Sequence, residues 1–177
     1  MNDDYWNNFL PGVEAAYKPW LHDHGSLTRR IQQRCENFAV QPLRSGLASI
    51  AYDESALLGL APHQLAYSRE VFLHADGSPV VFAHSACAPQ HLHGPWAALA
   101  GLGNQPLGAM LFAHPLVQRK PLRFKALHPR HPLYQRAVAP LAAPPARLWA
   151  RRSLFTLHDA PLLVTEVFLP GILSLKE

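Results

Sequence analysis

Two charged residues occur where the sequence predicts buried strands. Arg69 starts an apolar run whose alternation places it on the same face as Val71 and Leu73. Glu166 lies inside another apolar run, on the same face as Val164. A charge among core-facing residues costs several kcal/mol unless it is paired. The pattern fits an internal Arg–Glu ion pair or a strand at a wet sheet edge, and it also fits a polar ligand site in an apolar pocket.

A ligand site of this kind would use the two side chains in different ways. An arginine can bind a carboxylate through two parallel hydrogen bonds. A carboxylate can accept a hydroxyl hydrogen or remove a proton. Arg69 is therefore a candidate anchor for an acidic ligand, and Glu166 is a candidate hydroxyl ligand or general base.

The eleven histidines suggest a metal site, but their spacing argues against one. His22 and His24 form one i, i+2 pair, and His91 and His93 form another. Such a pair shares a face only on a strand, whereas both pairs occur in turn-like segments. The chain also lacks GxSxG, a Walker loop, GxGxxG after a strand and HExxH. We therefore expect surface or loop histidines.

The net charge of +4 is distributed unevenly along the chain. No acidic residue occurs between Asp76 and Asp159, so this interval should carry a positive field that attracts anions. Seven prolines interrupt its basic part and no known nucleic-acid motif occurs there, so nucleic acid is disfavoured as a partner. The basic residues fit either attraction of a small anion or plain solvated surface charge. The nine basic residues are Arg119, Lys120, Arg123, Lys125, Arg130, Arg136, Arg147, Arg151 and Arg152.

The elements that would position these residues can be placed from turn signals and apolar spacing. Two β-hairpins are predicted, over residues 68–85 and 151–170, and the first turns at Asp76–Gly77. A helix is predicted after Ser26, which can cap it. A helical pair is predicted over residues 95–112, with Asn104 as the cap of its second helix.

The remaining segments carry weaker signals. Residues 7–18 fit an interrupted helix, residues 37–52 fit an extended segment, and the proline-rich stretch after Phe112 is expected to have little regular structure. Hairpins without βαβ alternation predict an α+β domain, with an antiparallel sheet and helices on one side.

The length of 177 residues fits one domain that spans residues 1–177. No apolar run approaches the roughly 18 residues of a membrane span. The first residues lack the basic start and apolar run of a signal peptide, so we expect a cytoplasmic protein. Cys35 and Cys87 are the two cysteines, and a disulfide between them is one alternative, but reduced, packed thiols are favoured.

Four stretches of the sequence form a specific combination: DHGSLTRR (residues 23–30), REVFLHADGSPVVFAHS (69–85), LGNQPLGAMLF (102–112) and LWARRSLFTLHDAPLLVTEVFLP (148–170). Taken together, they resemble the chorismate pyruvate-lyase family. They occur in the order typical of the family and cover most of the chain between Asp23 and Pro170. Residues 121–147 depart from the family pattern by being longer and richer in proline, so no role is carried over from them.

The resemblance implies both a fold and a reaction. The fold would be an antiparallel sheet of about six strands, with helices over it and two helix-turn flaps above a buried ligand site. The reaction would split chorismate into 4-hydroxybenzoate and pyruvate, the first committed step of ubiquinone biosynthesis, and the product would inhibit the enzyme. Because aromatisation of the ring would drive this reaction, it would need no metal and no other cofactor. Chorismate and 4-hydroxybenzoate would be its partners, and we expect a monomer.

The same resemblance implies roles for four residues. Arg69 would hold the carboxylate of the aromatic product and Glu166 would meet its hydroxyl group, which makes both catalytic candidates. Leu27, where the family commonly has methionine, and Leu107 would line the site. A further cation should meet the enolpyruvyl carboxylate, and the candidates are Arg119, Arg151 and Arg152.

A rival interpretation is a binding module without catalytic activity. Ligand-binding domains of some bacterial transcription regulators share the chorismate-lyase fold and sense small molecules. Such domains normally follow a winged-helix region, and roughly 20 residues before the first motif offer no room for one. The enzyme is therefore the favoured interpretation.

Overall fold

Two long β-hairpins form the centre of the sheet, as their turn signals predict. β2 (Ala66–Ala75) and β3 (Ser78–Cys87) meet at Asp76 and Gly77, whose φ angles of 49° and 82° lie in the left-handed region. β6 (Leu148–Leu157) and β7 (Ala160–Phe168) form the second hairpin. β3 pairs with β7, so the two hairpins lie side by side in one antiparallel sheet.

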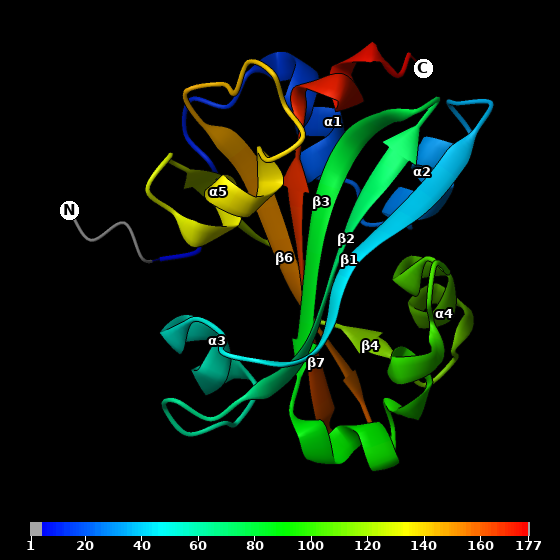
Figure 1. Cartoon of the computed structure of the whole chain (residues 1–177), viewed down its shortest axis with the longest axis vertical. Helices are drawn as coiled ribbons and strands as arrows, with labels where there is room; N and C mark the ends of the chain where they lie inside the picture. Colours follow the sequence, from blue (N-terminus) through cyan, green and yellow to red (C-terminus); the bar gives the residue numbers. More distant parts are fainter. Residues whose placement is uncertain (1–4, 177) are drawn as a thin grey trace.

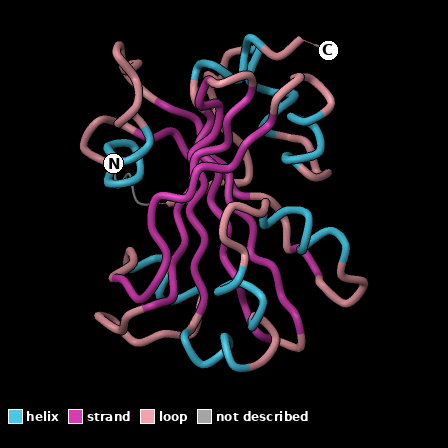
Figure 2. Tube along the Cα trace, turned by 45° about the vertical axis from the view of Figure 1, so that its right-hand side comes forward, coloured by secondary structure: helices cyan, strands magenta, loops and turns pink. Residues whose placement is uncertain are grey.

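The computed structural model describes residues 5–176, in which the sheet has seven strands. Their order is β1-β2-β3-β7-β6-β4, and β5 also pairs with β6. β1 (Phe38–Ala48) forms one edge, while β4 (Gln118–Arg119) and β5 (Arg123–Leu127) share the outer side of β6. The strands run the length of the molecule and twist strongly, with helices gathered around both ends (Figure 2).

Short helices cover both faces of this sheet (Figure 1). α1 (Lys18–Leu21), α2 (Leu27–Gln32) and α4 (Leu107–Ala113) lie on one face, and α3 (Tyr52–Leu57) and α5 (Pro132–Ala137) lie on the other. The sequence predicted helices on one side only. The central strands are buried along nearly their whole length, so both of their faces need cover.

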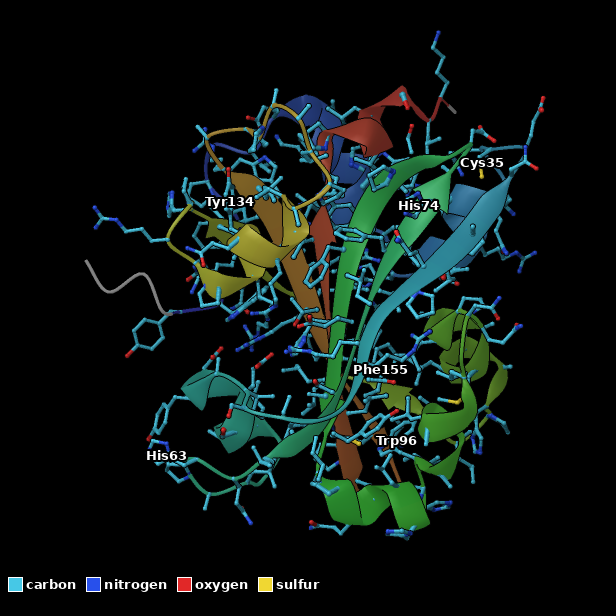
Figure 3. All side chains as sticks on the ribbon, viewed as in Figure 1. Cys35, His63, His74, Trp96, Tyr134 and Phe155 are labelled. Carbon is cyan, nitrogen blue, oxygen red and sulfur yellow. The ribbon has the colours of Figure 1, made fainter. Side chains whose placement is uncertain are left out.

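Four 3-10 turns complete the set of elements. They are η1 (Ala15–Tyr17), η2 (Pro89–His93), η3 (Ala97–Gly101) and η4 (Pro170–Ser174). Among the described residues, the buried hydrophobic side chains form four clusters that lie between the sheet and the elements that cover it. Figure 3 shows Phe155 on the side of the sheet that faces α4, with Trp96 near it, and Tyr134 on the side of α5.

Local predictions met different outcomes. The Ser26 cap is confirmed, because its Oγ accepts a hydrogen bond from the Arg29 amide at 3.3 Å. The Asn104 cap is wrong, since α4 begins after Pro106 and has no side-chain cap. The interrupted helix over residues 7–18 is also wrong: the segment contains only η1 and the first residue of α1.

The proline-rich stretch is more regular than the sequence predicted. It contains β4, β5 and α5, because its prolines occupy loops and the first position of α5, where a missing amide hydrogen costs nothing. The two strands in this stretch bring the sheet to seven strands, one more than the expected six. Both cysteines are free, and no helix within residues 5–176 is long and apolar enough to cross a membrane.

Candidate functional site

An enclosed cavity lies between one face of the sheet, α2 and α4. Its volume is about 50 Å³, and among the described residues its lining is mostly apolar. The four residues singled out from the sequence all line it: Leu27, Arg69, Leu107 and Glu166. The structure therefore brings together one arginine, one carboxylate and two leucines from four separate elements.

Arg69 enters the cavity from β2 and is only 6% exposed. Its Nη2 donates hydrogen bonds to the carbonyl oxygens of Gly103 at 3.1 Å and Gln105 at 2.9 Å, both in the loop before α4. Burial lowers the pKa of Arg69, against an opposing effect of Tyr67. An anion bound beside the guanidinium would offset this cost of burial.

Glu166 enters the cavity from β7, and its partner is not Arg69. Arg151, which is fully buried on β6, donates from Nε to Glu166 Oε2 at 2.5 Å. An internal Arg–Glu ion pair was one of the alternatives that the sequence allowed for Arg69 and Glu166. Such a pair exists, but it joins Glu166 to Arg151 and not to Arg69. The pair fixes the direction of the carboxylate, and the Glu166 side chain keeps 17% of its surface exposed.

The strand register sets Arg69 and Glu166 apart. Arg69 is paired with Ser85 on β3, whereas Glu166 is paired with Ala83 on the same strand. The two residues are thus two strands apart and offset by two positions, which puts their Cα atoms about 12 Å apart from ideal sheet spacings. That separation would let a small ring lie between the guanidinium and the carboxylate once the cavity has widened.

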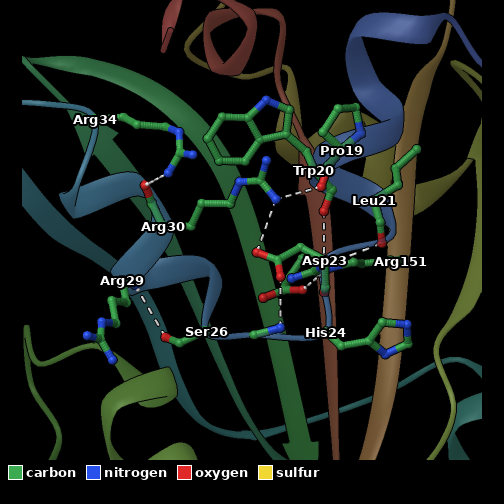
Figure 4. Close-up of polar contacts among 12 residues, drawn as sticks. Pro19, Trp20, Leu21, Asp23, His24, Ser26, Arg29, Arg30, Arg34 and Arg151 are labelled. Carbon is green, nitrogen blue, oxygen red and sulfur yellow. Dashed lines mark hydrogen bonds and ion pairs between the residues drawn. The ribbon is translucent and has the colours of Figure 1, made fainter. Parts of the chain in front are cut away.

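The first lid over the cavity is formed by residues 22–32, which end in α2. Its Leu27 is 3% exposed and points into the cavity. Arg151 Nη1 donates to the carbonyl oxygens of Trp20 at 3.0 Å and Asp23 at 2.6 Å (Figure 4). Arg30 Nη1 donates to the carbonyl oxygen of Pro19 at 2.7 Å, so arginines hold the segment that leads into the lid.

The second lid consists of residues 103–113, which include α4. Leu107 is 8% exposed and lines the cavity from this helix. The lids meet at Gly108, where the lack of a side chain permits a close approach: an added Cβ would lie 3.2 Å from Thr28 Oγ1 and 3.5 Å from Ser26 Oγ. Apolar cavities that take up benzene measure about 150 Å³. The closed cavity is smaller, so the lids must loosen before a ring enters.

The three candidate cations lie in different places. Arg119 lines the cavity, where its Nε donates to Ser153 Oγ at 2.8 Å and its Nη1 to the His24 carbonyl at 2.9 Å. Arg151 lies behind Glu166 and does not line the cavity. Arg152 points to the opposite face of the sheet, where it pairs with Asp53.

A larger hollow of about 460 Å³ lies on that opposite face, and its charges pair with one another. Buried His84 lies between Glu70 and Glu54, with Nδ1 and Nε2 each 3.0 Å from a carboxylate oxygen. Burial alone would lower the pKa of His84, but the two carboxylates outweigh it and raise the pKa to about 9. None of the four predicted site residues lines this hollow, so we place the site in the enclosed cavity.

Sequence reasoning missed several residues of the cavity wall. Ser85, Ser153 and Phe155 line it, as do Thr28 and Gly108 from the two lids. Alternation along the second hairpin puts Ser153 and Phe155 on the same face as Arg151, and this signal could have found them. No group of three or more potential metal ligands occurs among residues 5–176.

Comparisons with known proteins point to one family. The profile of the family described as chorismate lyase matches residues 8–176. A probable chorismate pyruvate-lyase of Nitrosospira multiformis is 50% identical over 171 residues, which cover 96% of this chain and 95% of that protein. A second one, from Nitrosomonas europaea, is 54% identical over 153 residues and covers 86% of each chain.

Solved structures show the same fold in another setting. The effector domain of PhnF from Mycobacterium smegmatis superposes with a TM-score of 0.61 at 14% identity, covering 83% of this chain and 90% of that one. The ligand-binding domain of a GntR-family regulator from Bordetella bronchiseptica gives a TM-score of 0.54 at 16% identity, covering 76% and 85%. At these identities the likeness concerns the fold alone.

Proposed function

Because the chain belongs to the chorismate lyase family, we propose that it converts chorismate to 4-hydroxybenzoate and pyruvate inside the enclosed cavity. The enzyme is a lyase, and its product leads to ubiquinone. We further propose that the protein acts as a monomer and that its partners are two small molecules, chorismate and 4-hydroxybenzoate. We place the reaction in the cytoplasm, with no role for nucleic acid.

The reaction is an elimination driven by aromatisation of the ring. The C–H bond at the hydroxyl-bearing carbon breaks, and its electron pair completes the aromatic ring. The neighbouring C–O bond breaks at the same time and releases enolpyruvate, which takes up a proton on carbon to become pyruvate. The protein therefore has to orient a dianion, accept one proton and stabilise the departing oxygen.

We assign Arg69 to the ring carboxylate and Glu166 to the hydroxyl-bearing end of the ring. Arg69 can bind a carboxylate through charge-assisted hydrogen bonds while it keeps its contacts with the second lid. Glu166 is proposed to accept a hydrogen bond from the ring hydroxyl. It would also act as the general base that removes the proton from the hydroxyl-bearing carbon. Leu27 and Leu107 would close the apolar walls around the ring.

The observation that carries this proposal is the meeting of Arg69 and Glu166 in one apolar cavity. They approach from separate strands, two strands apart, beneath α2 and α4. A charged contact with a ligand is stronger at such a largely buried place than at the protein surface. The regulator domains share only the fold, and no observation in the cavity favours sensing without turnover.

Replacement of Arg69 tests the proposed anchor. Arg69→Ala removes charge-assisted hydrogen bonds, so the affinity for 4-hydroxybenzoate should fall at least about tenfold. Lys120→Ala, at an exposed position outside the cavity, removes the same charge and should leave the affinity unchanged. Calorimetric titration of both variants checks this, and normal binding by Arg69→Ala would remove Arg69 from the site.

A further inference from the structure

Chorismate carries a second carboxylate, on its enolpyruvyl group, and the structure separates the three arginines that the sequence left as candidates for it. Arg152 is excluded because its guanidinium pairs with Asp53 on the opposite face of the sheet. Arg151 is fully buried behind Glu166, and its Nε and Nη1 already donate to Glu166 and to backbone carbonyls. Arg119 alone of the three lines the cavity.

Arg119 reaches the cavity from the side opposite Arg69. It belongs to β4, which lies beyond β3, β7 and β6 from the strand of Arg69. Its Nε is held by Ser153 Oγ at 2.8 Å, and the rings of Phe112 and Phe155 lie 5.6 and 5.4 Å from its guanidinium carbon. These contacts fix the guanidinium at the cavity wall.

The order of the substituents on chorismate matches the order of these charges. The hydroxyl and enolpyruvyl groups sit on neighbouring ring carbons, whereas the ring carboxylate lies opposite the hydroxyl. A cation for the enolpyruvyl carboxylate should therefore lie close to Glu166 and away from Arg69. Arg119 meets this condition, because its Nε is held by Ser153, which lies on β6 two residues from Arg151, the register partner of Glu166 on β7.

The charges of the cavity also match those of a dianion. Glu166 is neutralised by Arg151 from behind, which leaves two cations, Arg69 and Arg119, to face the ligand. We propose that Arg119 binds the enolpyruvyl carboxylate and so distinguishes the dianionic substrate from the monoanionic aromatic product. This inference rests on the proposed function. It adds a specificity-determining residue to it and links that residue to the first lid, through the bond from Arg119 Nη1 to the His24 carbonyl at 2.9 Å.

Two stable aromatic probes isolate the second carboxylate. One is 3-(1-carboxyvinyloxy)benzoate, and the other is 3-(isopropenyloxy)benzoate, in which a methyl group replaces the enolpyruvyl carboxylate. In the parent protein the dicarboxylate should bind at least about tenfold more tightly than the monocarboxylate. In Arg119→Met this preference should disappear. In Lys120→Met, which removes the neighbouring charge outside the cavity, the preference should remain.

Further variants separate binding from folding. Arg69→Met should weaken both probes while it keeps their ratio, because it loses only the ring carboxylate. Ser153→Ala removes the hydroxyl group that holds Arg119 Nε but leaves the charge of the cavity unchanged. It should therefore reduce the ratio of the two probe affinities. This variant gives a second test if Arg119→Met does not fold. The inference is overturned if the preference for the dicarboxylate survives in Arg119→Met, or if it is undiminished in Ser153→Ala. The proposed function itself fails only if the parent protein leaves chorismate unchanged.

Discussion

At the scale of single residues, a period of two identified Arg69 and Glu166 because both lie in long buried strands. The same period shows that Arg151 and Arg152 face opposite sides of β6, but it does not reveal which side holds the cavity. Arg119 offered no such signal, since β4 is only two residues long. Its role depends on Ser153, which is distant in sequence and adjacent only in the folded sheet.

The role of Glu166 as general base can be tested by an isosteric change. Glu166→Gln keeps a hydrogen-bonding group but cannot take up the proton, so turnover of chorismate should fall by about 10²–10⁴ while product affinity changes little. Asp53→Asn makes the same chemical change on the opposite face and should leave turnover intact. Near-normal turnover by Glu166→Gln would reduce Glu166 to an orienting role.

At the scale of elements, the two lids were expected from the family resemblance, but the hydrogen bonds that hold them to the sheet were not. Arg69 binds carbonyl groups of the second lid, and Arg119 and Arg151 bind carbonyl groups of the first. Every residue has a backbone carbonyl group, so a sequence pattern cannot predict which of them will accept these hydrogen bonds. The second lid is thus held by Arg69, which lines the cavity. The first lid is held by Arg119, which also lines the cavity, and by Arg151, the ion-pair partner of Glu166.

Truncation of Leu27 should affect the closed, product-bound state. Leu27→Ala removes about 2–5 kcal/mol of packing, and part of this loss falls on the closed lid because an open lid leaves the side chain exposed. The inhibition constant of 4-hydroxybenzoate should therefore rise more than the single-turnover rate falls. Leu133→Ala, at a buried leucine on the opposite face, should lower stability without raising the inhibition constant. If inhibition by Leu27→Ala is unchanged while its stability falls, Leu27 is ordinary core.

The contact between the lids gives a second test, in which the affinity for the product should fall while the melting temperature does not. Alanine in a helix is normally more stable than glycine by about 1 kcal/mol. Gly108→Ala, however, places its Cβ 3.2 Å from Thr28 Oγ1. We expect weaker binding of 4-hydroxybenzoate without a loss of melting temperature. Gly101→Ala, which meets nothing within 4 Å, is the matched control, and equal product affinity in both variants would contradict a tight contact between the lids.

At the scale of the whole molecule, the sequence predicted the class and the hairpins but not the second helical layer. Turn signals such as Asp76–Gly77 are local, so they could be identified without the fold. The position of α3 and α5 depends on strands buried on both faces. The charged network around His84 is equally non-local, because its carboxylates come from β2 and α3.

This network should make stability depend on pH. The folded-state pKa of His84, about 9, lies above its ordinary value of 6.5, so the stabilisation is complete below about pH 6.5 and is lost as pH rises through 9. The loss should be on the order of 3 kcal/mol. His84 faces Glu54 and Glu70, and Glu70 also pairs with Arg44 and Arg136. Urea unfolding between pH 6 and pH 9.5 should show this loss in the parent protein and a flatter profile in His84→Gln. An equal slope in both proteins would contradict it.

The most direct test of the account is to give purified protein chorismate alone, in the presence of excess EDTA. Aromatisation drives the elimination, and the cavity supplies two cations and one carboxylate for it. The account predicts equimolar 4-hydroxybenzoate and pyruvate at a rate that the chelator does not change. No product, or product only after a divalent ion is restored, would contradict it.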